Sequence, residues 1–69
     1  MKDEGLLFEI IRGAFAQRRK TIENGIKRLC PAPRDALFRA GIDPMKRPET
    51  LSLEDFARLA DEVFEMRAG

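Results

Sequence analysis

The chain has 69 residues, of which 36% are charged, with one cysteine and no histidine. At this length it lies near the lower limit for a domain that folds unaided, and Cys30 alone cannot form an internal disulfide. The composition excludes histidine-based catalysis and metal binding, and the short apolar runs exclude a membrane span. We therefore expect residues 1–69 to form a single domain in a reducing, cytoplasmic setting.

The net charge of +1 conceals an uneven distribution of charge along the chain. Residues 12–47 hold ten lysines and arginines against three acidic residues, whereas residues 1–11 and 48–69 are both acidic. Such a basic segment is typical of a protein that binds an anionic partner. Its richness in arginine, and the absence of one basic amphipathic helix, favour nucleic acid over a membrane surface.

Residues 4–15 are predicted to form the first helix, because apolar residues recur there at helical spacing. Residues 18–30 are predicted to form a second helix, which ends before Pro31. One continuous helix over 4–30 would roughly keep the same register, so both forms stay open. We favour a break near 16–18, because that segment has no large apolar residue and a small chain must bend to close a core.

The third helix is predicted over residues 33–40, and its two ends carry clear signals. Pro33 suits the first turn of a helix, where its missing N–H would have no partner. Gly41 suits the left-handed position just after the last turn. In a Schellman ending of this kind, Ile42 would fold back over Leu37.

The fourth helix, predicted over residues 53–66, has the clearest start in the chain. Ser52 can cap it, and Asp55 can return the hydrogen bond as a short form of the capping box. No segment alternates with a period of two, so the expected fold class is all-α, a small four-helix bundle. Its expected core residues are Leu7, Ile11, Phe15, Ile22, Ile26, Leu37, Phe56, Leu59 and Val63.

Three consecutive cations, Arg18, Arg19 and Lys20, are the strongest candidate for a functional site. If a helix begins at residue 18, they lie in its first turn, where the helix dipole disfavours cations and favours a bound phosphate. The full set of candidate RNA- or phosphate-binding residues is Arg12, Arg18, Arg19, Lys20, Asn24, Lys27, Arg28 and Arg47.

Each of these residues also has a purely structural interpretation. The cations could form only a solvated surface. Thr21 could cap the second helix, and Asn24 could hold the 42–50 loop in place. Arg47 could form an internal ion pair with Glu49.

We predict no catalytic residue, no cofactor-binding residue and no metal ligand in this chain. The five glycines are isolated from one another, so none belongs to a glycine-rich loop that could hold a cofactor phosphate. Cys30 is interpreted as a small, buried apolar residue rather than a reactive thiol. The chain alone is therefore not expected to be an enzyme.

Two segments resemble a known family. Residues 15–26, FAQRRKTIENGI, match the pattern F-x-Q-R-R-K-T-[LI]-x-N, and residues 40–60, AGIDPMKRPETLSLEDFARLA, match G-I-D-x-x-x-R-x-E-x-[LI]-[ST]. Together they are similar to the C-terminal domain of the bacterial small-subunit rRNA adenine dimethyltransferases, in the ribosomal RNA adenine N-6-methyltransferase family. The chain departs from the family pattern at Gly25, where Ala or Ser is expected, and at Pro48, where Ala is usual.

The resemblance implies a parent enzyme that uses S-adenosylmethionine to dimethylate two adjacent adenosines of a small-subunit rRNA hairpin late in ribosome assembly. The parent's Rossmann-like catalytic domain has no counterpart in this chain, which is expected to be a helical domain that docks on the rRNA. The implied partners are the small-subunit rRNA or ribosomal particle and the N-terminal methyltransferase domain, with no DNA and no membrane. Two other classes stay open, namely a small protein–protein interaction module and a helix-turn-helix DNA-binding protein, which the acidic fourth helix disfavours.

Overall fold

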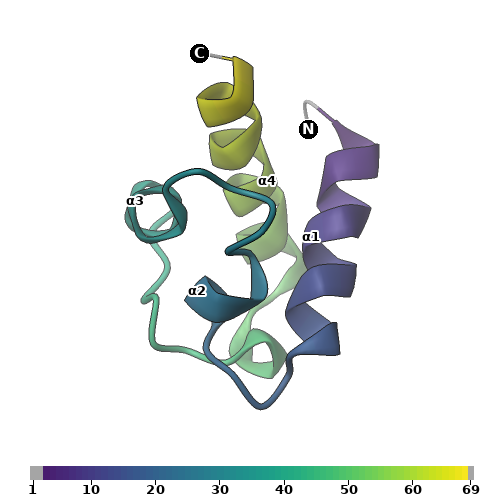
Figure 1. The fold of residues 1–69 in the computed structure, drawn as a ribbon, viewed down its shortest axis with the longest axis vertical. Coiled ribbons are helices and arrows are strands. Elements are labelled where there is room, and N and C mark those ends of the chain that lie inside the picture. The colour runs from purple at the N-terminus through teal and green to yellow at the C-terminus, as the bar shows by residue number, and fades with distance from the viewer. Residues whose placement is uncertain (1–2, 69) are drawn as a thin grey trace.

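The computed structural model describes residues 3–68 of the chain. Its helices are α1 (Glu4–Ala16), α2 (Ile22–Gly25), α3 (Pro33–Arg39) and α4 (Leu53–Ala68), and the 3-10 helix η1 (Pro48–Thr50) precedes α4. The two long helices, α1 and α4, lie side by side, while α2 and α3 pack on them (Figure 1). No strand occurs between residues 3 and 68, which confirms the predicted all-α class.

Helix α1 begins at a side-chain cap and buries a face different from the predicted one. Asp3 accepts a hydrogen bond from the Leu6 N–H at 3.1 Å. The prediction that Ile11 and Phe15 are core residues was wrong, because Ile11 is half-buried and Phe15 is 43% exposed. The buried face consists of Leu6, Leu7, Ile10 and Ala14.

The reason lies in what packs against α1. Helix α2 approaches it so closely that a Cβ atom at Gly25 would lie 2.9 Å from the Ala14 Cα. This contact turns the small Ala14 inward, and Phe15 is left at the edge of the core. There its ring lies beside that of Phe56, with centroids 6.0 Å apart. The pair is a contact between α1 and α4.

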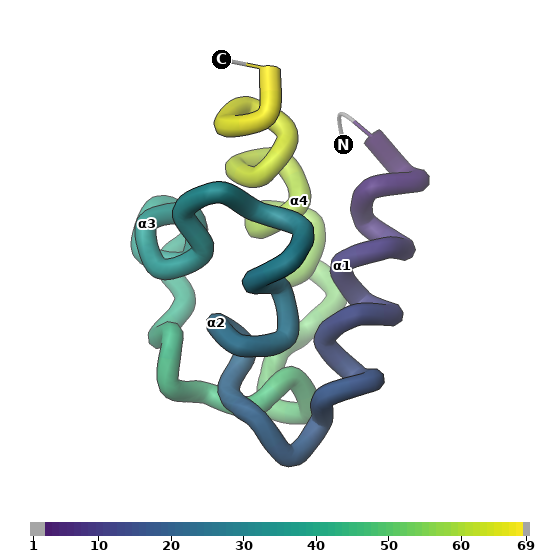
Figure 2. The backbone as a smooth tube through the Cα atoms, viewed as in Figure 1, coloured from purple at the N-terminus to yellow at the C-terminus, as the bar shows by residue number. Residues whose placement is uncertain are grey.

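The prediction of a long second helix over 18–30 was wrong, whereas the predicted break near residues 16–18 was confirmed. Helix α1 ends at Ala16, and α2 contains only four residues. Thr21 caps α2 by accepting a hydrogen bond from the Asn24 N–H at 3.5 Å. Residues 26–29 continue as a turn, and the tube in Figure 2 shows the chain reversing direction before α2 and crossing over to α3 after it.

Helix α3 ends in the Schellman motif that the sequence predicts. Gly41 has a positive φ of 76°. The Ile42 N–H donates to the Leu37 carbonyl at 2.8 Å, and the Gly41 N–H donates to the Phe38 carbonyl at 3.1 Å. Ile42 is therefore folded back over the helix and buried.

Helix α4 begins with the predicted reciprocal cap. The Ser52 N–H donates to the Asp55 carboxylate at 3.0 Å, and the Asp55 N–H donates to the Ser52 hydroxyl at 3.1 Å. The core that α4 completes includes Cys30, which is buried as expected of a small apolar residue. The other residues of the core beyond α1 are Ile22, Ile26, Ala36, Leu37, Ala40, Ile42, Phe56, Leu59, Ala60 and Val63, and Pro44 and Pro48 are buried as well.

Candidate nucleic-acid interface

The three consecutive cations lie in the turn between α1 and α2, and all three are exposed. The interpretation that they occupy the first turn of a helix was therefore wrong. The first two amides of α2 are also already used, because the Ile22 N–H donates to the Lys46 carbonyl at 2.6 Å and the Glu23 N–H to the Pro44 carbonyl at 3.4 Å. The first two amides of α2 are therefore not available to an anion at this turn, whereas the exposed cationic side chains are.

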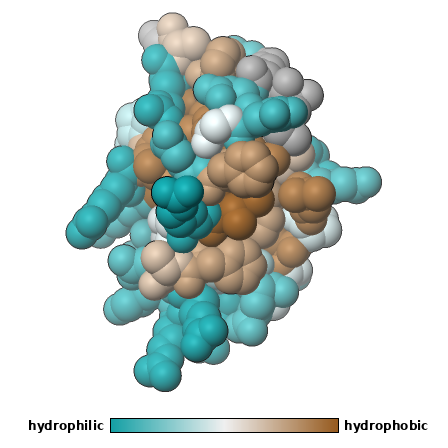
Figure 3. Space-filling view, turned by 90° about the vertical axis from the view of Figure 1, so that its right-hand side faces the viewer, coloured by the Kyte–Doolittle hydropathy of each residue, from teal (hydrophilic) through white to brown (hydrophobic). Residues whose placement is uncertain are grey.

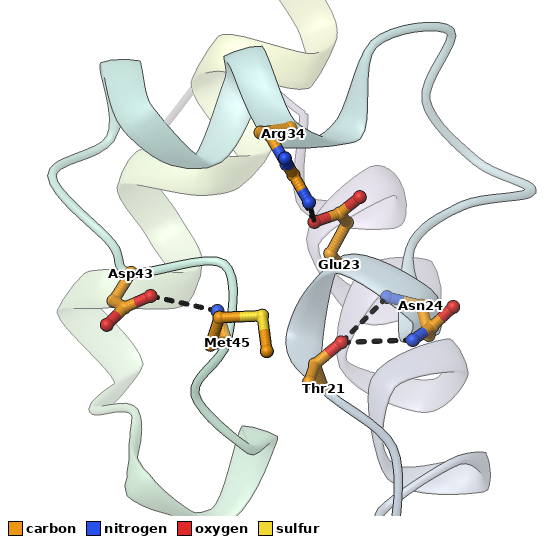
Figure 4. Close-up of polar contacts among 6 residues, drawn as sticks. All are labelled: Thr21, Glu23, Asn24, Arg34, Asp43 and Met45. Atoms are coloured by element: carbon orange, nitrogen blue, oxygen red, sulfur yellow. Dashed lines mark hydrogen bonds and ion pairs between the residues drawn. The ribbon is translucent and has the colours of Figure 1, made fainter.

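No acidic residue between residues 3 and 68 forms an ion pair with the triplet. Glu23, the acid nearest to it in the sequence, pairs with Arg34 at 3.1 Å (Figure 4). The other ion pair within the described residues joins Arg58 to Asp55. Arg18, Arg19 and Lys20 thus repel one another without a carboxylate to compensate, and this arrangement attracts an external anion.

A hollow of about 440 Å³ lies between the end of α1 and α2. Its lining residues are Gly13, Ala16, Gln17, Lys20, Asn24, Gly25, Lys27 and Arg28. A second hollow, of about 380 Å³, is lined by Ala16, Gln17, Arg18, Arg19 and Lys20. Because the two hollows share Gln17 and Lys20, the fold gathers six of the eight candidate residues at one end of the molecule.

Gln17 is the functional candidate that sequence reasoning missed. It lines both hollows, and its side chain forms no hydrogen bond to the described part of the chain. The signal was present, because Gln17 is one of the residues of the family motif that contains the triplet.

The Asn24 side chain does not hold the 42–50 loop in place, as its structural interpretation suggested. Its side-chain amide donates to the Thr21 hydroxyl at 3.1 Å rather than to the 42–50 loop (Figure 4). That loop is tied to α2 by backbone hydrogen bonds from Ile22 and Glu23. The same close-up shows the loop's own turn, in which the Met45 N–H donates to the Asp43 carboxylate at 2.9 Å.

Arg12 and Arg47 stand apart from the other candidates. Both are exposed, and neither lines the two hollows. Arg47 precedes η1, and its carbonyl accepts hydrogen bonds from the Thr50 N–H and hydroxyl. It forms no ion pair with Glu49, so that interpretation was wrong.

An apolar surface lies on the α1 side of the molecule. Figure 3 looks onto this side and shows hydrophobic residues gathered at its centre, with hydrophilic side chains around them. Exposed Phe8 belongs to α1, and Leu53, at the start of α4, is 67% exposed. Between residues 3 and 68, no helix is both long and apolar enough to cross a membrane, and no three Cys, Asp or Glu side chains are grouped so that they could hold a metal ion.

No protein-family model matches the chain, but curated relatives do. It is 48% identical over 67 residues to the "Ribosomal RNA small subunit methyltransferase A" of Clostridium acetobutylicum, covering 93% of this chain and 24% of that protein. The protein of the same name from Chromobacterium violaceum is 48% identical over 97% of this chain and 25% of its own length. That of Clostridium botulinum (strain Loch Maree) is 42% identical over 96% and 25%. The chain thus spans about a quarter of these relatives, in their C-terminal part.

Proposed function

Because this chain belongs, by its sequence, with the C-terminal part of the ribosomal RNA small subunit methyltransferase A proteins, we propose that it is a domain that docks on small-subunit rRNA. The observation that carries the proposal is the group of cations without carboxylate partners around the two hollows at the α1–α2 turn. These cations are Arg18, Arg19, Lys20, Lys27 and Arg28.

Side-chain cations in an exposed turn suit the backbone of structured RNA. Folded RNA is recognised largely by its shape and its phosphates, and contacts to phosphates set the register without reading the sequence. Arginine and lysine side chains can reach several phosphates at once, whereas the first two amides of α2 are engaged by the 42–50 loop and the next two by Thr21. The proposed role is therefore docking and orientation rather than base-specific reading.

We also propose what the longer parent protein does, of which this chain would be one domain. The parent is an rRNA adenine dimethyltransferase of ribosome biogenesis that uses S-adenosylmethionine in a separate N-terminal domain. In this proposal the present chain is non-catalytic and binds no cofactor itself. Its partners are the small ribosomal subunit and that N-terminal domain, in the cytoplasm.

The test is a salt titration of binding to a small-subunit rRNA hairpin. Each neutralised phosphate contributes about −0.9 to the slope of log K against log salt for B-DNA, and structured RNA should behave similarly. Replacing Arg18, Arg19 and Lys20 by Ala should flatten the slope by roughly 2–3 and weaken binding to different RNA hairpins alike. Helix content by circular dichroism should stay unchanged, because exposed charges contribute little to stability.

The matched control removes cations that line neither hollow. Arg39→Ala with Arg67→Ala should leave the slope nearly unchanged. If the triple variant keeps the wild-type slope, the triplet is only a solvated surface. If the triple variant is unfolded, the triplet is structural and the phosphate argument fails.

A small helical protein–protein interaction module is the second candidate, and the exposed Phe8, Phe15 and Leu53 favour it. The same titration separates the two. An interaction module would show no salt-dependent binding to the hairpin.

A further inference from the structure

The hollow of about 440 Å³ between α1 and α2 is lined by both cationic and neutral amide side chains. A docking surface for phosphates alone would need only the cations. Lys20, Lys27 and Arg28 supply three positive charges. Gln17 and Asn24 supply neutral amides, each with a donor and an acceptor. No carboxylate and no aromatic ring lines the hollow. Without an aromatic ring the hollow lacks the usual stacking platform for a base, and its cations and amides suit a sugar and its phosphate.

Glycines account for the shape of this hollow. A Cβ at Gly13 would lie 3.2 Å from the Gly25 carbonyl oxygen, and a Cβ at Gly25 would lie 2.9 Å from the Ala14 Cα. The absence of side chains at both positions lets α1 and α2 meet along their backbones. With Ala16 they form a floor of small residues, above which the longer polar side chains can close around a ligand.

Asn24 is held in one orientation by its neighbour. Its Nδ2 donates to the Thr21 hydroxyl at 3.1 Å, and its backbone N–H donates to the same oxygen. The amide oxygen is thereby directed away from Thr21 (Figure 4), and no hydrogen bond within residues 3–68 engages it. A fixed, unused acceptor beside three cations is suited to a hydroxyl group next to a phosphate.

We propose that this hollow is a ribose-phosphate subsite. Lys20, Lys27 and Arg28 hold one backbone phosphate, and the Asn24 amide oxygen accepts a hydrogen bond from the adjacent ribose 2′-hydroxyl, with Gln17 as a second amide. The subsite then distinguishes RNA from DNA, because only RNA carries the 2′-hydroxyl. This inference rests on the proposed function, and it adds a selectivity that cations alone cannot provide.

The experiment compares two probes, an rRNA hairpin and the same hairpin with 2′-deoxyriboses throughout its unpaired loop. The wild-type chain should bind the all-ribose hairpin more tightly. Asn24→Ala should reduce this preference by roughly three- to tenfold, the effect of one lost hydrogen bond. Arg18 and Arg19 lie outside this hollow. Replacing both by Ala should weaken binding to the two probes equally and leave the preference for the all-ribose hairpin unchanged.

Gln17→Ala provides a second variant in case the loss of Asn24 unfolds α2, because the Gln17 side chain forms no hydrogen bond within the described chain. A wild-type chain that binds both probes equally overturns the inference, as does an Asn24→Ala variant with undiminished preference. Both outcomes leave the docking proposal standing, provided that binding still falls steeply with salt. Absence of salt-dependent binding to either probe removes both proposals.

Discussion

Asp55 helps to link the start of α4 to the end of α3 through Arg58. It accepts a hydrogen bond from the Ser52 N–H and forms an ion pair with Arg58, whose Nε donates to the Ala40 carbonyl at 3.1 Å. The cap of α4 is thereby linked to the end of α3. The backbone hydrogen bond from Ser52 is the main cause that lowers the pKa of Asp55 below its ordinary value of 3.8, with the Ser52 hydroxyl and Arg58 acting in the same direction.

This lowered pKa predicts how stability depends on pH. A carboxyl group with a lower pKa in the folded state stabilises the fold above its unfolded pKa, and this contribution is lost as the pH falls through the folded value. The wild-type chain should therefore lose stability below about pH 3.8. Asp55→Asn should melt at a lower temperature than wild type at pH 7, and the difference should shrink towards about pH 2.

Thermal melts followed by circular dichroism at neutral and at acidic pH make this comparison. Ser52→Ala serves as the companion variant, since it removes the other half of the cap and keeps the charge of Asp55. Equal melting temperatures for wild type and Asp55→Asn at neutral pH would show that the charge of Asp55 does not contribute to stability.

At the scale of single elements, α2 is the least autonomous helix. Four residues are too few to form a stable helix alone. Fixing the backbone of one turn costs more free energy than its first hydrogen bond provides. Its position is set by the cap at Thr21, by the carbonyls of the 42–50 loop and by the close contact of Gly25 with α1. The hollow beside it therefore depends on tertiary contacts.

The end of α3 allows a clean test of backbone conformation. No atom lies within 4 Å of the position that a Cβ at Gly41 would occupy, so a substitution there meets no steric contact. Gly41→Ala should nevertheless destabilise the chain by about 1–2 kcal/mol, because the left-handed backbone at φ 76° is unfavourable for a residue with a Cβ.

Urea unfolding gives the free energies for this comparison. Gly41→Asn is the matched variant and should cost less, since Asn tolerates left-handed backbone better than Ala does. If Ala is accepted without loss of stability, the Schellman ending does not hold α3 in place.

At the scale of the whole molecule, the basic turn and the two helix ends lie far apart. The turn between α1 and α2 lies at one end, and the start of α1 and the end of α4 lie together at the other (Figure 1). The described chain measures about 30 × 20 × 20 Å along its principal axes. A bound RNA at the basic end is therefore distant from both ends of the described segment.

The proposal that the chain binds no S-adenosylmethionine is tested at this scale as well. The five glycines are isolated in the sequence, so they form no glycine-rich loop for a cofactor. The hollows at the two ends of the molecule are lined in part by charged side chains. Isothermal calorimetry with the chain and S-adenosylmethionine should give no heat of binding. Micromolar affinity would contradict the assignment of the cofactor to another domain.

Local signals in the sequence were sufficient for part of this fold. The Ser52–Asp55 cap and the Gly41 ending involve residues within a few positions of one another, so the chain carries them wherever it folds. The break after α1 was predictable for a similar reason. The uneven charge and the three consecutive cations also indicated an anionic partner, and the motif around them pointed to the family of the relatives.

Contacts between distant residues decided what local patterns could not. The apolar pattern of α1 allows several faces to turn inward, and the approach of Gly25 to Ala14 selected the one that leaves Phe15 exposed. Helix α2 was predicted too long, because the spacing of apolar residues contains no information about the hydrogen bond from the Ile22 N–H to the distant Lys46 carbonyl.

The sequence by itself thus determined the helical class, the helix ends that depend on neighbouring residues, and the positive charge of the middle segment. Only the tertiary structure decided which face of α1 is buried, how short α2 is, and that Lys27, Arg28 and Asn24 line one hollow with Lys20 and Gln17. The physical reason is the distance along the chain over which residues interact. Helix caps and local charge depend on neighbouring residues, whereas the burial of a side chain and the residues that line a hollow depend on which segments meet when the chain closes its core.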